Sequence, residues 1–117
     1  IQYTFARIRS ILRKAEERNY KASLHNQPML EKELRLIKLM TTYPQVLEES
    51  AASCSPAMVA NFSFDLAREF NQYYHEVSVL HEQDAQLRAQ RLLLLVQVAK
   101  LLESSMDLLG ITLPERM

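Results

Sequence analysis

The 117-residue chain contains one glycine and four prolines. These two residue types form most of the tight turns that an all-β protein needs, so a chain with so few of them is expected to be helical. Its composition, with 48% hydrophobic and 24% charged residues, is typical of a globular soluble domain. We therefore predict an all-α fold and a single domain over residues 1–117.

Apolar residues recur at spacings of three and four in five segments, which predicts a bundle of about five helices. The expected helices cover residues 1–20, 28–40, 44–52, 56–74 and 84–109. Pro28, Pro44 and Pro56 stand where proline is best tolerated, in the first turn of a helix. Residues 75–83 fit either a frayed continuation or a loop.

The last expected helix has clear signals at both ends. Asp84 can cap its first turn. Gly110, followed by Ile111 and Pro114, is the sequence form of a left-handed C-terminal cap. Apolar residues cover the helix so broadly around residues 92–96 that we expect it to lie at the centre of the bundle.

The second expected helix divides into an apolar and an acidic set. Its first turn holds Glu31 and Glu33, which are interpreted as solvated residues that favour the positive end of the helix dipole. Its expected core face consists of Met29, Leu30, Leu34 and Ile37, with Leu36 and Met40 as further candidates.

The first expected helix has two distinct faces. Its core face is the stripe Ile1, Phe5, Ile8, Leu12 and Ala15. Since each residue advances about 100° around the axis, a second stripe lies well away from this face. That stripe consists of Tyr3, Arg7, Ser10 and Lys14. We expect these four side chains to lie in solvent unless something else covers them.

Charge is distributed unevenly along the chain. The net charge is zero, which argues against a protein that coats nucleic acid by bulk attraction. Residues 1–21 nevertheless hold six basic and two acidic residues, a net of +4, which leaves −4 for the rest. This gradient is expected if the first helix faces an anion, although a solvated helix face would also produce it.

Several classes of site are excluded by the sequence. A single glycine does not suffice for a phosphate-binding glycine loop. His75-Glu76 and His81-Glu82 lie six residues apart, not four as in a helical zinc site, so we expect no metal. Cys54, the one cysteine, fits a reducing compartment and is interpreted as a small buried side chain near a helix end. No catalytic residue is identified, and no apolar run is long enough to cross a membrane.

The Tyr3 and Arg7 pair remains as the candidate binding feature. A tyrosine ring offers a stacking platform for an unpaired base, and an arginine one turn away can reach a phosphate or stack on a base. Tyrosine and arginine one turn apart also pair structurally on many helices, so this spacing is weak evidence by itself.

Five ordered sequence blocks resemble one known family. They are QYTFARIRSILRKA at the start, P-x-V-L-E at residues 44–48, D-L-A-x-x-F-N-x-Y-Y at 65–74, R-L-L-L-L at 91–95 and the terminal LLGITLPERM. Together they span the chain and are similar to the C-terminal anticodon-binding (DALR) domain of arginyl-tRNA synthetases. The resemblance implies an all-α bundle that docks the anticodon stem-loop of the tRNA for arginine.

The resemblance also implies what lies outside this chain. A separate class I catalytic domain would activate arginine with ATP and Mg²⁺ in a cytoplasmic enzyme, and this domain alone would have no cofactor and no activity. A start at Ile1 without methionine likewise suggests a piece of a longer chain. We therefore expect the catalytic domain and the tRNA as partners, and no membrane.

Site residues follow from the resemblance in part. It implies that Tyr3, Arg7 and Met117 lie against the splayed anticodon bases, and the Gly110 cap would turn the last seven residues back toward the first helix. Helical geometry adds Ser10 and Lys14 as candidate contacts to the RNA backbone. At Thr4-Phe5 many members of the family have a small residue and a histidine, and Phe5 falls on the apolar stripe instead.

A second interpretation belongs to another class of function. The broad apolar surface of the fifth expected helix would also suit a protein interaction or dimerisation module.

Overall fold

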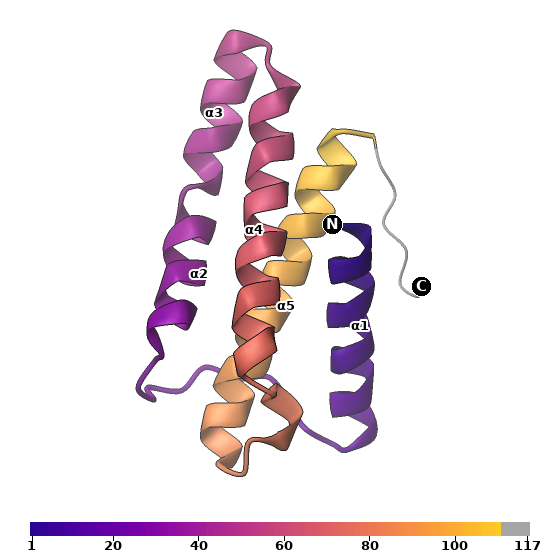
Figure 1. Ribbon diagram of the computed structural model, residues 1–117, viewed down its shortest axis with the longest axis vertical. Coiled ribbons are helices and arrows are strands. Elements are labelled where there is room, and N and C mark those ends of the chain that lie inside the picture. The colour runs from indigo at the N-terminus through magenta and orange to yellow at the C-terminus, as the bar shows by residue number, and fades with distance from the viewer. Residues whose placement is uncertain (111–117) are drawn as a thin grey trace.

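The structure, a computed structural model, describes residues 1–110. This part of the chain is helical and contains no strand. The elements are α1 (Gln2–Glu17), α2 (Glu31–Thr41), α3 (Tyr43–Ser53), α4 (Pro56–Glu76), the 3₁₀ turn η1 (Val79–His81) and α5 (Ala85–Leu108). Only Thr42 separates α2 from α3, and the two stack end to end, so the five helices form four columns (Figure 1). The all-α bundle is therefore confirmed.

Helix ends follow the local signals in most places. Pro44 and Pro56 lie in the first turns of α3 and α4, and the Asp84 carboxylate accepts hydrogen bonds from the amides of Gln86 and Leu87. Gly110 has a φ of +77°, which confirms the left-handed cap after α5. The residues that this cap precedes, 111–117, lie outside the described residues.

The start of α2 differs from the prediction. The helix begins at Glu31, three residues after Pro28, and Leu30 is still extended. The physical reason is a cap made from within the helix, because the Glu33 Oε1 atom accepts the Leu30 amide at 2.8 Å.

The core lies between α5 and the helices around it. Leu95, Val98 and Leu102 of α5 are fully buried, which confirms its central position. They belong to one cluster with side chains of α1 and α4, among them Phe5, Ile8, Phe62, Leu66 and Phe70. Burying each such side chain contributes roughly 1.5–3 kcal/mol. Helix α1 is therefore held by its apolar face against α5 and α4 (Figure 1).

A charged network lies inside the bundle, and the sequence-based interpretation of Glu33 as a solvated residue is wrong. Glu33 is 2% exposed. Its Oε2 atom accepts hydrogen bonds from the Tyr73 hydroxyl at 2.7 Å and from Arg91 Nε at 3.0 Å. Arg91 Nη1 donates in turn to Glu82 at 2.9 Å. The network joins α2, α4 and α5 to the segment after η1.

This network also sets the rotation of α2. Because Glu33 faces the interior, the buried apolar residue of the helix is Leu36, at 0% exposed. Three residues of the predicted core face, Met29, Leu30 and Leu34, are instead 38–45% exposed. Burial also raises the pKa of the Tyr73 hydroxyl far above its usual value, and the hydrogen bond to Glu33 acts in the same direction.

Cys54 is exposed, which corrects its interpretation as a buried side chain. It does lie at a helix end, as the C-cap of α3, where its φ of +53° is left-handed. In this conformation the residue ends the helix and its side chain stays in solvent. None of the helices within residues 1–110 is long and apolar enough to cross a membrane.

Candidate nucleic-acid interface

The second face of α1 lies at the surface. Phe5 and Ile8 hold the opposite face in the core, at 2% and 0% exposed. Tyr3 is consequently 59% exposed, in agreement with the helical spacing. Arg7 and Lys14 are exposed and Ser10 is half-buried. The four residues therefore form an accessible stripe along α1.

Arg7 lies between two tyrosine rings. Its guanidinium carbon is 5.9 Å from the centre of the Tyr3 ring and 5.0 Å from the centre of the Tyr74 ring. Tyr74 belongs to α4 and stacks on the buried Phe70 ring at a centroid distance of 5.8 Å. Cation–π attraction thus fixes the guanidinium on a ring that the core itself holds in place.

Sequence reasoning did not identify Tyr74 as a site residue. The fourth expected helix has apolar residues at spacings of three and four, and Tyr74 follows Phe70 by four residues, which predicts that it lies on the buried face. The signal that would have found it is the Tyr73-Tyr74 doublet. Adjacent helical residues point about 100° apart, so the two rings cannot both face the centre of the core. Tyr73 is fully buried, and Tyr74 is half-buried at the rim beside Arg7.

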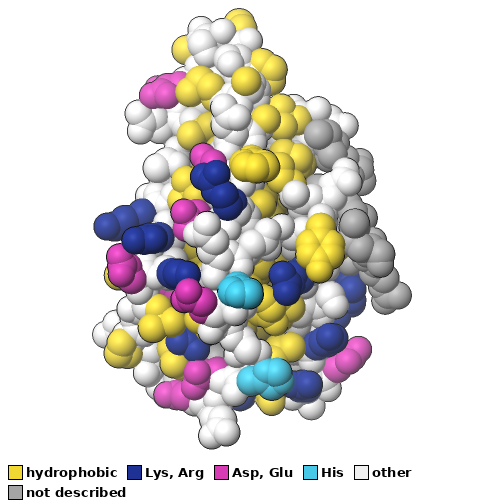
Figure 2. All heavy atoms as spheres, viewed as in Figure 1, with side chains coloured by type: hydrophobic (Ala, Val, Ile, Leu, Met, Phe, Trp, Pro, Cys, Tyr) yellow, Lys and Arg dark blue, Asp and Glu magenta, His cyan; other side chains and the backbone are white. Residues whose placement is uncertain are grey.

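A groove of about 620 Å³ runs along this edge. Its lining brings the predicted stripe together with Tyr74, and consists of Tyr3, Ala6, Arg7, Ser10, Ile11, Arg13, Lys14 and Tyr74. Figure 2 shows the Lys and Arg side chains that gather over α1 on this side of the molecule. The groove therefore combines two aromatic rings with several cations.

Such a lining suits an unpaired nucleotide better than other ligands. Tyrosine rings can stack on bases, and cations beside them can contact the phosphates that connect those bases. Within residues 1–110 no carboxylate forms an ion pair with Arg7, so its N–H groups can donate to a ligand. Met117, the remaining predicted contact, lies outside the described residues.

Other chemistry finds no comparable arrangement in the described part of the chain. No group of three or more His, Cys, Asp or Glu side chains among residues 1–110 is placed to hold a metal ion. His75 and His81 are exposed and His25 is half-buried. The groove beside α1 is therefore the feature on which a functional interpretation depends.

Comparison with known proteins gives consistent results. The model of the DALR anticodon binding domain family matches residues 1–117. An arginine–tRNA ligase of Parabacteroides distasonis is 48% identical over the whole of this chain, and one of Flavobacterium psychrophilum is 44% identical. The chain spans only about a fifth of the length of these relatives.

A solved structure agrees with the sequence relatives. The Thermus thermophilus arginyl-tRNA synthetase superposes on 99% of this chain with a TM-score of 0.83 and 31% sequence identity, again over 20% of its own length. These findings confirm the resemblance carried by the five sequence blocks. The chain belongs to the DALR anticodon binding domain family.

Proposed function

We propose that this chain recognises the anticodon stem-loop of the tRNA for arginine, as the C-terminal domain of an arginine–tRNA ligase. The observation that carries the proposal is the Arg7 guanidinium between the Tyr3 and Tyr74 rings, on an exposed and basic edge. The similarity to arginine–tRNA ligases supports the identity of the RNA.

The chemical step belongs to the rest of the protein in this proposal. The relatives are about five times as long as this chain, which leaves room for a catalytic domain. That domain would join arginine to the tRNA with ATP and Mg²⁺ in the cytoplasm. Residues 1–117 then act as one domain that binds RNA and positions it, with the catalytic domain as its neighbour.

Five residues of the groove and Met117 have proposed roles. Tyr3 and Tyr74 stack on one unpaired base of the anticodon loop, which is splayed out of the stack of its neighbours. Arg7 donates to a phosphate or a base edge between them. Ser10 and Lys14, further along the same groove, contact the RNA backbone, and Met117 completes the contact with the bases.

The alternative function, a protein interaction module, requires an exposed apolar surface on α5. The broad apolar surface of this helix is instead buried at the centre of the core. Within residues 1–110, Leu108 is the one large hydrophobic side chain of α5 that is exposed.

The test measures the full-length enzyme with an arginine tRNA and with its anticodon stem-loop. Tyr3→Ala, Arg7→Ala, Tyr74→Ala and deletion of Met117 should each weaken RNA binding, because stacking contributes roughly 1–3 kcal/mol per base. The expected loss is about five- to a hundred-fold in Kd, with a matching fall in kcat/KM for arginylation. Arg35→Ala on α2 is the control, since this arginine is exposed and forms an ion pair with Glu31 within its own helix. Unchanged RNA affinity in all four variants would contradict the assignment of these residues to the RNA-binding site.

A further inference from the structure

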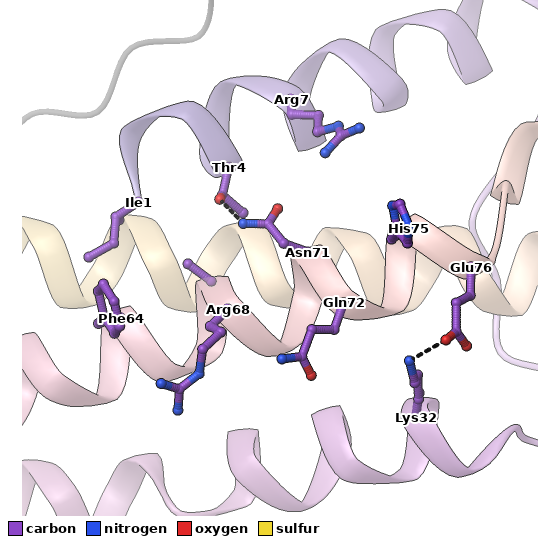
Figure 3. A pocket seen from close by; sticks show the side chains of 11 residues that line it. Ile1, Thr4, Arg7, Lys32, Phe64, Arg68, Asn71, Gln72, His75 and Glu76 are labelled. Carbon is purple, nitrogen blue, oxygen red and sulfur yellow. Dashed lines mark hydrogen bonds and ion pairs between the residues drawn. The ribbon is translucent and has the colours of Figure 1, made fainter.

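A second groove lies on the other side of Arg7, between α1 and α4. Its volume is about 590 Å³, within the usual range for small-molecule sites. Ile1, Thr4 and Arg7 form the wall on α1, and Lys32 of α2 lies at the far end (Figure 3). The α4 side carries Phe64, Ala67, Arg68, Asn71, Gln72, His75 and Glu76. The proposed role of the first groove does not use these α4 side chains.

Phe64 presents an aromatic ring to solvent in this groove. It is 58% exposed, although α4 buries Phe62 and Phe70 in the core. The Arg68 guanidinium carbon lies 5.7 Å from the centre of the ring, and an ion pair with Asp65 at 3.0 Å holds the guanidinium there. An exposed ring with a planar cation beside it is the combination on which unpaired bases stack.

The floor of the groove holds an incompletely satisfied amide. Asn71 Nδ2 donates to the Thr4 hydroxyl at 2.9 Å, while the buried Asn71 Oδ1 has no partner within the described residues (Figure 3). A buried acceptor without a donor is costly, so a ligand that supplies a donor at this end of the amide is favoured. The amino groups of bases and the ribose 2′-hydroxyl are donors of this kind.

The charges of this groove favour an anionic ligand near Arg7. Among the described residues that line it, the one carboxylate is that of Glu76, which is already paired with Lys32 at 2.7 Å. The hydrogen bond from Lys32 is the main cause that lowers the pKa of Glu76, so this carboxylate stays ionised beside its cation. Arg7 lines both grooves and has no ion pair within residues 1–110.

We propose that the groove between α1 and α4 binds a second unpaired nucleotide of the same RNA loop, adjacent to the one at Tyr3 and Tyr74. Its base stacks on Phe64 and Arg68, and Asn71 accepts a hydrogen bond from the base or ribose. Arg7 contacts the phosphate that links the two nucleotides. This inference rests on the proposed function, because the occupant of the first groove defines the RNA.

The experiment measures Kd for the full-length enzyme and a set of arginine tRNA anticodon stem-loops, each with one loop base removed and its backbone intact. Wild-type enzyme should lose affinity when either of two neighbouring bases is missing. Phe64→Ala should bind the intact loop roughly five- to a hundred-fold more weakly and become insensitive to removal of one of these bases. The Kd of Tyr74→Ala should not change when the other base is removed. Each substitution and its matching base removal form a double-mutant cycle, and the two cycles therefore measure two separate contacts.

Matched controls separate the removal of a specific RNA contact from general effects of substitution. Leu24→Ala removes another exposed apolar side chain, 81% exposed, that lies outside both grooves. Arg35→Ala matches Arg68→Ala, because the two arginine side chains are 57% and 55% exposed and each forms an ion pair within its own helix. Both control variants should bind every RNA like wild type, whereas Arg68→Ala should follow Phe64→Ala.

Three results would overturn the inference in distinguishable ways. In the first, Phe64→Ala and Arg68→Ala bind all RNAs like wild type while Arg7→Ala and Tyr74→Ala bind weakly. This result would contradict the second nucleotide site and would still support the proposed function. In the second, none of the four variants changes RNA affinity, which would contradict both the second nucleotide site and the proposed function. A lower unfolding temperature of the full-length enzyme on Phe64→Ala, with unchanged RNA binding, identifies the groove as an interface with the rest of the protein.

Discussion

Two arginines of this molecule have opposite surroundings. Arg91 on α5 is buried, and its guanidinium donates to the carboxylates of Glu33 and Glu82 at 3.0 and 2.9 Å. Arg7 on α1 is exposed, and the groups beside it are the rings of Tyr3 and Tyr74. The same side chain is thus held by hydrogen bonds in one place and by aromatic faces in the other.

The difference separates a structural arginine from one available to a ligand. Carboxylates neutralise the Arg91 charge and use its N–H donors, as burial of a charge requires. Aromatic rings attract the Arg7 cation through its planar face and leave the N–H donors at its edge free. Stacking therefore positions a guanidinium without using the groups that recognise phosphate or a base.

The largest expected effect tests the buried arginine. Arg91→Leu removes the cation beside Glu33 and leaves a carboxylate that is 2% exposed without its charged partner. Breaking a buried pair in this way costs about 3–5 kcal/mol. We expect the free energy of unfolding to fall by this amount in urea titrations followed by far-ultraviolet circular dichroism.

Arg35→Leu serves as the control for that measurement. Arg35 and Glu31 form an exposed pair within one turn of α2, and such pairs contribute roughly 0.3–0.5 kcal/mol. The two substitutions remove the same groups from the protein, so the difference between them measures burial together with the second ion pair of Arg91, to Glu82. An Arg91→Leu variant as stable as Arg35→Leu would show that the internal network does not hold the helices together.

Local chemistry explains which parts of the fold could be predicted from sequence. Asp84, Pro44, Pro56 and Gly110 act on the backbone within a few residues of themselves, so their roles are visible in the sequence. Helical spacing likewise placed the apolar face of α1 in the core and its second face in solvent.

Helical spacing did not predict the surroundings of Glu33 and Tyr74, because these surroundings come from distant segments. The Tyr73-Tyr74 doublet indicates that one of the two rings leaves the core, but it does not indicate which residue lies beside that ring. A glutamate in the first turn of a helix is explained equally well by the helix dipole, and Arg91 lies 58 residues further along the chain. Tyr74 fits a core stripe by spacing, and only the packing of α4 against α1 places its ring beside Arg7. For the candidate site, helical spacing therefore predicted the residues on α1 but not the residue on α4.

The exposed arginine should show the reverse pattern of effects. Arg7→Ala in the full-length enzyme should weaken stem-loop binding by about 1.5–3 kcal/mol, the range for hydrogen bonds to charged groups. It should also reduce the slope of log K against log salt by about 0.7 for each phosphate that Arg7 neutralises. The free energy of unfolding should change by at most about 0.5–1 kcal/mol, since an exposed cation–π contact contributes no more.

Lys38→Ala is a suitable control for the salt dependence, because Lys38 is an exposed cation of α2 that lines neither groove. Equal slopes for wild type and Arg7→Ala would contradict a phosphate contact. A large loss of stability on Arg7→Ala would instead place Arg7 in the same structural class as Arg91.

The smallest expected effect concerns the Tyr73 hydroxyl, which donates to Glu33 inside the buried network at 2.7 Å. Near neutral pH, Tyr73→Phe should lower the free energy of unfolding by about 1–2 kcal/mol, because the carboxylate keeps its other donors. Burial and Glu33 raise the pKa of Tyr73 in the folded state, whereas the unfolded chain titrates near the ordinary value of 10.0. Above that pH the unfolded state loses a proton that the folded state keeps, so wild-type stability falls by up to about 1.4 kcal/mol per pH unit relative to the variant. Urea titrations from about pH 8 to about pH 11 should therefore show the difference between the two proteins shrinking above pH 10, and a constant difference would mean that the hydroxyl is not held protonated by the fold.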